Sequence, residues 1–317
     1  MTAASAPGKI ILFGEHAVVS GIPALGGAID LRARVTIDHL PGRTLIEAGD
    51  LMLKGFSIDL ISGQLTSAGA ANAIRYVSAV LKEFEARDLR IKVESDLPAA
   101  SGLGSSAAIV VAATAALNEH MNLGLSRKDI ASQAHRIEKA VQQGLGSPMD
   151  TALATFGGYL QVSSDIRPLD LPQLEMVVGY TERAHDTRSE VEKVQSLLVR
   201  HAEIVGPIFQ AIGAISTKGV SLLRELDLQG LGELMNINQG LLEAVGVGTR
   251  ELSELVYAAR EAGAWGAKLT GAGGGGCMIA LPPPQGSSGV ATAMRQAKGR
   301  AFAVQTGCEG VRLEGGS

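Results

Sequence analysis

The stretch of the chain most suggestive of chemistry is residues 98–108, which read PAASGLGSSAA. Gly102 and Gly104 permit positive φ angles and a close approach of the backbone to a ligand. Ser105 or Ser106 then stands where a helix is expected to begin, and serine is a favoured N-cap residue. The first turn of a helix offers unpaired N–H groups and the positive end of the dipole, so the stretch predicts a cradle for nucleotide phosphates.

Two observations keep an alternative open, in which the stretch is a turn that only caps a core helix. No Gly-Lys-Ser/Thr follows the glycines, as a Walker A loop requires. The third glycine of a dinucleotide-binding fingerprint is missing as well. The phosphate-binding interpretation therefore depends on other polar residues of the chain.

A first set of such residues stands near the start of the chain, where residues 8–19 read GKIILFGEHAVV. Lys9 opens an apolar strand that Gly14 ends, and Glu15 and His16 follow at a turn. Charged groups beside a buried strand cost free energy unless they have partners, so these three side chains could form one wall of a site. The alternative is a solvated strand end with a structural histidine.

Two carboxylates follow the glycine-rich stretch. Glu138 lies in a helix predicted over residues 126–143, which Ser126 and Asp129 open with a capping-box pattern. Asp150 begins a new element after a break that contains Gly144 and Pro148, where it could serve as the N-cap. A carboxylate on a solvated helix face and a capping carboxylate are the alternatives to a catalytic pair.

A second glycine-rich stretch lies near the end of the chain, where residues 268–277 read KLTGAGGGGC. Four consecutive glycines cost conformational entropy on folding, and they are expected where side chains cannot fit. A flexible linker is a poor alternative, because an apolar strand follows at once. The stretch is therefore predicted to join two strands at a place where backbone meets ligand.

Composition narrows the class of protein. The 317 residues are 46% hydrophobic and 19% charged, with a net charge of −4 and only 3% aromatic residues. These values indicate a globular protein and do not favour nucleic-acid or membrane partners. Cys277 and Cys308 have no metal-ligand spacing. With no signal-peptide pattern and no long apolar run, we expect a cytoplasmic protein.

Periodicity predicts a mixed order of elements with a change of character near residues 155–170. We expect a hairpin-like turn at Pro41-Gly42 between two strands, and Thr66 and Ser67 as helix caps or adenosine contacts. Residues 186–262 are predicted to be mostly helical, with breaks near 206–207, 230 and 246–248. Other predicted elements are strands at 24–38, 44–48, 89–93, 159–162, 174–180 and 301–305 and helices at 69–86, 107–117 and 290–299.

In chain order, residues 7–19, 98–108 and 268–277 resemble the three signature motifs of the GHMP kinase family. The segment that contains Glu138, Asp150-Thr151 and Phe156-Gly157-Gly158 is also similar to members of that family. The resemblance implies an α+β, two-domain GHMP kinase fold with the active site between the domains. Residues 1–160 would form an N-terminal ribosomal-protein-like α/β domain that binds nucleotide. Residues 161–317 would form a ferredoxin-like C-terminal domain with extra helices.

The resemblance also implies a reaction, transfer of phosphate from ATP with Mg²⁺ to a small-molecule hydroxyl, and a homodimer. Asp150 would act as the general base, or only position the hydroxyl, and Lys9 would compensate its charge. Glu138 and Ser106 would bind Mg²⁺, with Ser105 as the alternative to Ser106. The ATP phosphates would be bound by Pro98, Ser101, Gly102, Leu103, Gly104, Ser105 and Ser106, and the acceptor by Glu15, His16, Thr270, Gly271, Ala272 and Gly273.

One departure from the family pattern concerns the spacing of the two carboxylates. The chain has one more residue between Glu138 and Asp150 than the family pattern, and we place that residue in the helix-end loop around residues 142–144. Four alternatives remain: another small alcohol as the acceptor, an acceptor that already carries a phosphate, a non-catalytic nucleotide sensor, and an RNA-binding protein. The intact Lys9, Glu138 and Asp150 argue against the sensor, and the acidic composition argues against RNA binding.

Overall fold

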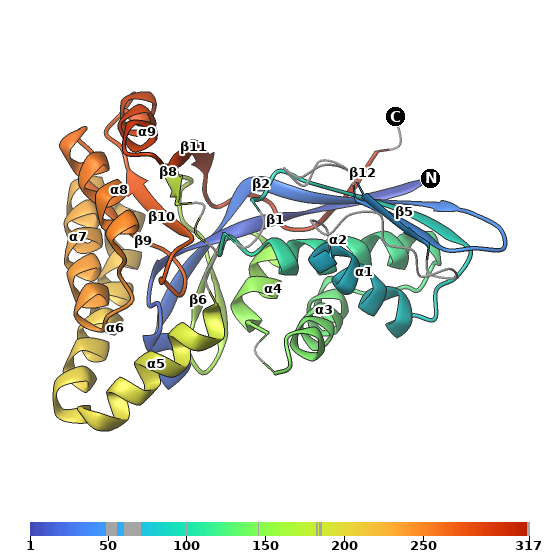
Figure 1. Ribbon diagram of the computed structural model, residues 1–317, viewed down its shortest axis with the longest axis horizontal. Helices are drawn as coiled ribbons and strands as arrows, with labels where there is room; N and C mark the ends of the chain where they lie inside the picture. Colours follow the sequence, from blue (N-terminus) through green and yellow to red (C-terminus); the bar gives the residue numbers. More distant parts are fainter. Residues whose placement is uncertain are drawn as a thin grey trace.

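The computed structural model describes residues 1–48, 56–59, 71–98, 101–144, 146–181, 183 and 186–315. These residues form two sheets, each covered by helices (Figure 1). The N-terminal sheet has the order β12-β1-β2-β5-β3-β4, with β6 and β7 attached to β2. Its strands are β1 (Thr2–Phe13), β2 (Ala24–His39), β3 (Leu45–Ala48), β4 (Phe56–Asp59), β5 (Leu89–Ser95), β6 (Tyr159–Val162), β7 (Ile166–Leu169) and β12 (Arg312–Glu314).

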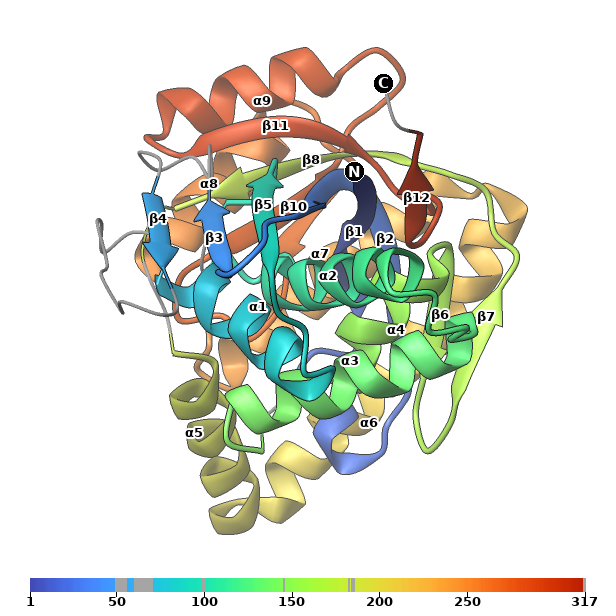
Figure 2. The same cartoon turned by 90° about the vertical axis from the view of Figure 1, so that its right-hand side faces the viewer.

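Four helices lie on one face of this sheet (Figure 2). They are α1 (Ala71–Glu83), α2 (Ser105–His120), α3 (Arg127–Val141) and α4 (Pro148–Phe156). The central helix α2 is buried on every side over residues 107–117, as expected of a helix that is apolar all round. Its alanines let the sheet and the other three helices approach closely, so the start of α2 is held firmly against β1.

The second sheet has the order β11-β8-β10-β9, with every neighbouring pair antiparallel. Its strands are β8 (Glu175–Tyr180), β9 (Gly266–Leu269), β10 (Cys277–Leu281) and β11 (Arg300–Gln305). This order and the β-α-β-β-α-β succession are ferredoxin-like. Helix α9 (Ser287–Gln296) forms one of the two helical crossovers of this fold. Four helices take the place of the other crossover helix: α5 (Thr187–Arg200), α6 (Ala202–Glu225), α7 (Leu228–Ala244) and α8 (Arg250–Glu261). The predicted fold class is confirmed.

Two amide side chains of α7 satisfy the free edge of strand β9. Asn236 accepts a hydrogen bond from Ala267 N (3.1 Å) and donates one to Trp265 O (3.0 Å). Gln239 accepts a hydrogen bond from Leu269 N at 2.7 Å. An open strand edge carries unpaired backbone groups, so these amides replace a missing neighbouring strand and fix β9 on α7.

Two predictions about element order are wrong. Strand β3 does not form a hairpin with β2, because β5 lies between them and pairs with β3 in parallel. Helix α6 continues through Pro207, and the chain breaks instead at His201, between α5 and α6. The later breaks fall at Asp227, the N-cap of α7, and between α7 and α8.

The division at residue 160 stays a prediction. Strands β7 and β12 both follow that residue, yet both belong to the N-terminal sheet. Strand β12 pairs with β1, and Ser5 Oγ donates a hydrogen bond to Glu314 Oε1 at 2.5 Å. In the part of the chain that the structure describes, no helix has the length and apolarity that crossing a bilayer demands.

Substitution of Asn236 by alanine should destabilise the second sheet. The change leaves Ala267 N and Trp265 O without their side-chain partner, and an unsatisfied buried backbone group costs about 1–3 kcal/mol. We expect a loss of that size in the free energy of unfolding, measured by urea denaturation. Ile237→Ala, at a side chain that is 54% exposed on the same helix, is the control and should change little.

Candidate active site

The loop before α2 is seated on strand β1 at Lys9. Lys9 N donates a hydrogen bond to Leu103 O at 2.9 Å. Gly104 has a φ of 76°, and a Cβ there would lie 2.9 Å from Lys9 Cγ. Only glycine fits this position without displacing Lys9, so the glycine fixes the loop against the lysine stem.

The predicted serine cap of α2 is wrong. The helix begins at Ser105 with Gly104 as its N-cap, and no side chain caps its first turn. Ser101 folds the preceding loop, because its Oγ donates to Pro98 O at 2.8 Å. The first N–H groups of α2 thus have no side-chain acceptor, which is the arrangement that binds anions at helix N-termini.

Lys9 and Asp150 form an ion pair across the site. Lys9 Nζ lies 3.4 Å from Asp150 Oδ2, and the two side chains are 7% and 17% exposed. Asp150 is not the N-cap of α4, as the sequence suggested; Ser147 is, and its side chain accepts a hydrogen bond from Asp150 N. With the cap supplied by Ser147, the Asp150 carboxylate stays available on the first turn of α4.

Glu138 is a fully buried carboxylate beside this pair. Its Oε1 accepts hydrogen bonds from Ser106 Oγ (2.7 Å) and Gln142 Nε2 (3.0 Å). Among the described residues, its Oε2 has no hydrogen-bond partner. Burial, helped by the nearby charge of Asp150, raises the pKa of Glu138 to about 7.

These oxygens suit a hard divalent cation. Mg²⁺ prefers oxygen ligands, commonly takes one or two carboxylates, and fills its other positions with water and substrate phosphates. The unpartnered Glu138 Oε2 beside the Ser106 hydroxyl is such a donor set. A search of the described residues finds no cluster of three or more His, Cys, Asp or Glu that could enclose a metal alone.

Residues 142–144, where we place the additional residue between the carboxylates, follow the end of helix α3. Helix α3 ends at Val141, and Gln143 and Gly144 follow with positive φ angles of 54° and 102°. The turn is therefore outside the helix and leaves Glu138 facing Ser106. Gln142, which the sequence analysis did not single out, contributes the second hydrogen bond to Glu138.

His16 occupies a strained turn at the end of β1. Its φ and ψ are 61° and −44°, and Ala17 N donates to Glu15 O at 2.7 Å, which makes a γ-turn of the rare hand. The ring Nε2 lies 2.8 Å from Ala272 O, so Nε2 must carry the proton. Burial lowers the pKa of the His16 ring, which favours its neutral form.

Glu15 contacts two residues that the sequence analysis did not assign to the site. Its Oε1 forms an ion pair with Lys268 Nζ, and both side chains are 0% exposed. Asn238 Nδ2 donates to Glu15 Oε2 at 3.3 Å. The only sequence signal for this contact is a lysine inside the otherwise apolar strand β9. The carboxylate faces these residues, and a contact between Glu15 and substrate stays a prediction.

The second glycine-rich loop, between β9 and β10, joins two strands as predicted. Thr270 binds both backbone groups of Ile11, accepting from its N–H (2.9 Å) and donating to its C=O (3.0 Å). A Cβ on Gly271 would lie 3.9 Å from Gly102 O, so the two glycine loops are neighbours. A Cβ on Gly273 would lie 2.3 Å from Val247 O, which explains why no side chain fits there.

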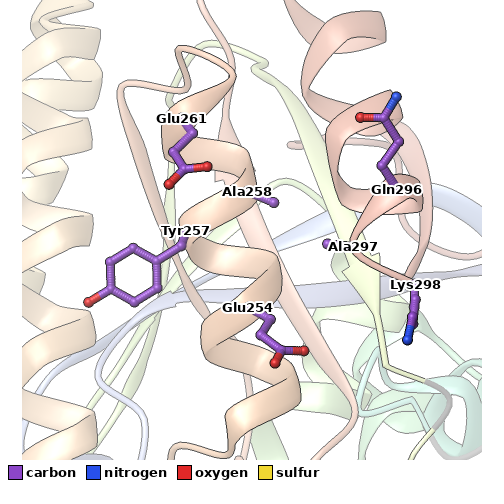
Figure 3. A pocket seen from close by; sticks show the side chains of 7 residues that line it. All are labelled: Glu254, Tyr257, Ala258, Glu261, Gln296, Ala297 and Lys298. Carbon is purple, nitrogen blue, oxygen red and sulfur yellow. The ribbon is translucent and has the colours of Figure 1, made fainter.

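Candidate residues from all three motifs therefore lie close together. Thr66 and Ser67, which were predicted as helix caps or adenosine contacts, lie outside the described residues. A separate hollow lies between α8 and α9 (Figure 3). None of the candidate residues lines it; its lining is Glu254, Tyr257, Ala258, Glu261, Gln296, Ala297 and Lys298. Lys9, Ser106, Glu138 and Asp150 lie at the junction of β1, α2, α3 and α4.

Comparison with known families gives two matches. The family profile described as GHMP kinases N terminal domain matches residues 70–158, and the profile described as GHMP kinases C terminal matches residues 220–301. The chain is 41% identical to a mevalonate kinase from Thermococcus sibiricus, over 98% of each chain. It is 42% identical to a mevalonate kinase from Pyrococcus abyssi, over 98% of this chain and 97% of the relative.

Solved structures agree with these sequence matches. The crystal structure of L. major mevalonate kinase in complex with R-mevalonate has a TM-score of 0.83 at 26% identity, over 96% of each chain. The Methanococcus jannaschii mevalonate kinase has a TM-score of 0.82 at 26% identity, over 96% of this chain and 98% of that one. The similarity therefore extends over both sheets.

Without divalent cations, Glu138 should make the protein less stable as the pH rises. The pKa of Glu138 is about 7 in the folded protein against an ordinary 4.5, so the folded state binds the proton more tightly. Its contribution is full below pH 4.5 and is lost as the pH rises through about 7. In EDTA, this titration should lower the free energy of unfolding of the parent protein by roughly 2–4 kcal/mol as the pH rises. The Glu138→Gln variant should not show this decline.

The measurement is urea denaturation of both proteins from about pH 5 to about pH 8, the range over which this group titrates. The difference between the two curves isolates Glu138 from other titrating groups. Glu119→Gln, at an exposed position of α2, is the control and should follow the parent protein. Parallel curves for the Glu138 variant and the parent would contradict the raised pKa.

Proposed function

The chain belongs to the GHMP kinase family and is an ATP-dependent kinase of small molecules, and we propose that its acceptor is mevalonate. The reaction transfers the γ-phosphoryl group of ATP to the primary hydroxyl of mevalonate. It gives ADP and 5-phosphomevalonate, a product used in isoprenoid biosynthesis. The observation that carries the acceptor is the identity of over 40% to mevalonate kinases along nearly the whole chain.

The form of the first motif supports the same acceptor. Residues 14–19 read GEHAVV, which resembles mevalonate kinases, whereas galactokinases carry Asp-Tyr after the Glu-His pair.

Asp150 and Lys9 supply the proposed proton transfer. The Asp150 carboxylate accepts the proton of the acceptor hydroxyl while the hydroxyl oxygen attacks the γ-phosphorus of ATP. The bond between that phosphorus and the β,γ-bridging oxygen breaks at the same time. The Lys9 ammonium, 3.4 Å from the carboxylate, compensates its charge and stabilises negative charge on the transferring group. If Asp150 only positions the acceptor hydroxyl, its ion pair with Lys9 still holds the carboxylate in place.

The loop before α2 supplies the proposed phosphate site. The uncapped N–H groups at the start of α2 bind phosphate oxygens and add the positive end of the helix dipole. Ser106 and Glu138 would hold Mg²⁺, and Glu138 Oε2 is the buried oxygen that such an ion would satisfy. When bound, Mg²⁺ would offset charge on the phosphates. A homodimer remains a prediction from the family resemblance.

Asp150→Asn should lower kcat for ADP release by roughly 10²–10⁴, the usual value of a general base. The amide keeps the size of the side chain but cannot accept the proton. The assay follows ADP release with ATP, Mg²⁺ and mevalonate, phosphomevalonate, homoserine or galactose in turn. Asp170→Asn, at an exposed position after β7, is the matched control and should keep parental turnover.

The acceptor series decides the substrate. Turnover with mevalonate alone, lost in the Asp150 variant, would support both the acceptor and the base. Turnover with a different alcohol would overturn mevalonate and keep the kinase mechanism. ATP binding without turnover of any acceptor would point to the nucleotide-sensing alternative.

Ser106→Ala should raise the Mg²⁺ concentration for half-maximal activity by roughly tenfold or more, because it removes a hydroxyl ligand and the partner of Glu138. Titration of Mg²⁺ at saturating ATP measures the change. Ser105→Ala is the paired variant, since Ser105 occupies the preceding position of the same turn. A larger effect of the Ser105 variant would assign the metal contact to Ser105 instead.

A further inference from the structure

Lys268 is a fully buried lysine whose charge the proposed phosphoryl transfer does not use. It lies on β9, where its neighbours Ala267 and Leu269 are also fully buried. Its ammonium pairs with Glu15 Oε1 and donates to Leu269 O at 2.6 Å. Burial lowers the pKa of Lys268, while Glu15 opposes that shift.

A buried ion pair is a poor device for stability alone. Desolvation of both charges offsets most of their attraction, and apolar residues of similar volume often serve stability as well or better. Where such a pair occurs, it can instead specify one arrangement of the chain. The arrangement specified here is that of the segment after β1, because Glu15 lies in the turn that follows β1 and Lys268 lies in the other sheet.

The segment that Glu15 anchors contains the strained γ-turn at His16. A residue other than glycine with φ near 60° persists only where surrounding contacts determine it. On one side of the turn, the Glu15 carboxylate is held by Lys268 and Asn238. On the other side, the His16 ring is held by Ala272 O.

This geometry leaves one polar atom of His16 unused. Nε2 is committed to Ala272 O, so Nδ1 carries a lone pair, and within the described residues it is buried without a partner. Buried acceptors are normally satisfied, and a hydroxyl of the phosphate acceptor would satisfy this one. The orientation of Nδ1 depends on the γ-turn, and the turn depends on Glu15.

We propose that Lys268 is a positioning residue that, through its ion pair with Glu15, holds the γ-turn that orients His16 towards the acceptor substrate. The proposal rests on the proposed function for the identity of the acceptor. It predicts that loss of the pair weakens acceptor binding and leaves ATP binding intact, because within the described residues the loop before α2 hydrogen-bonds to Lys9, whereas Lys268 bonds to Glu15 and Leu269.

The test compares Lys268→Met with the double variant Lys268→Met/Glu15→Gln. The single variant leaves an uncompensated buried carboxylate and should be strongly destabilised. The double variant has no buried charge and should regain thermal stability. We expect the double variant to keep a KM for mevalonate raised by roughly tenfold or more, with a KM for ATP near the parental value.

Asn236→Ala is the matched control, since it weakens the same strand without contacting Glu15. It should lower Tm and leave the KM for mevalonate unchanged. A double variant that recovers both the Tm and the KM for mevalonate would overturn the proposal, because the pair would then be only structural.

A second readout needs no catalysis. In protein labelled with ¹⁵N-histidine, the His16 signals, assigned by their absence in His16→Gln, should report a fixed Nε2–H tautomer. The double variant should lose that fixed tautomer; an unchanged tautomer would overturn the role of Lys268. A parent protein inert towards mevalonate would overturn the proposed acceptor instead, and the tautomer would still decide the role of Lys268.

Discussion

Hydrogen bonds from the backbone of β1 hold the candidate site together. Lys9 N binds the loop before α2 through Leu103 O, and both backbone groups of Ile11 bind Thr270 of the second glycine loop. One strand therefore sets the distance between the proposed phosphate-binding loop and the proposed acceptor loop. Glycine is required where the proposed phosphate-binding loop approaches β1, since a Cβ on Gly104 would press against the Lys9 side chain. The second and third motifs are far apart in sequence, yet both contact this strand, which carries the first motif.

The sequence was informative where chemistry demands unusual residues. Consecutive glycines predicted a loop that admits no side chain, and Gly273 to Gly276 all have positive φ angles. The capping box at Ser126 and the strand at Leu89–Ser95 could be predicted because their signals are local. The two-domain fold followed from the resemblance of the motifs to a family, not from periodicity. The roles of the individual site residues remain predictions after the structure.

The errors share a cause, which is that local patterns do not report tertiary partners. Pro41-Gly42 marks a turn, but the insertion of β5 beside β2 depends on contacts made much later in the chain. Pro207 is tolerated within α6, so a proline alone did not mark the break. Lys268 stands in the third motif, but its ion pair with Glu15 could not be predicted because the two residues lie near opposite ends of the sequence. Asp150 resembled a cap because Ser147, three residues earlier, is an equally good one.

The pairing of β12 with β1 has a consequence for biosynthesis. Ala3, Ala4 and Ser5 pair with Glu314, Leu313 and Arg312, so strand β1 receives its outer neighbour only after residues far along the chain have been made. Until then the outer edge of β1 is open, and open edges invite pairing with other nascent chains. Contacts between such distant residues also form slowly, since a long loop must close first. The N-terminal sheet is therefore completed only after β12 has been synthesised.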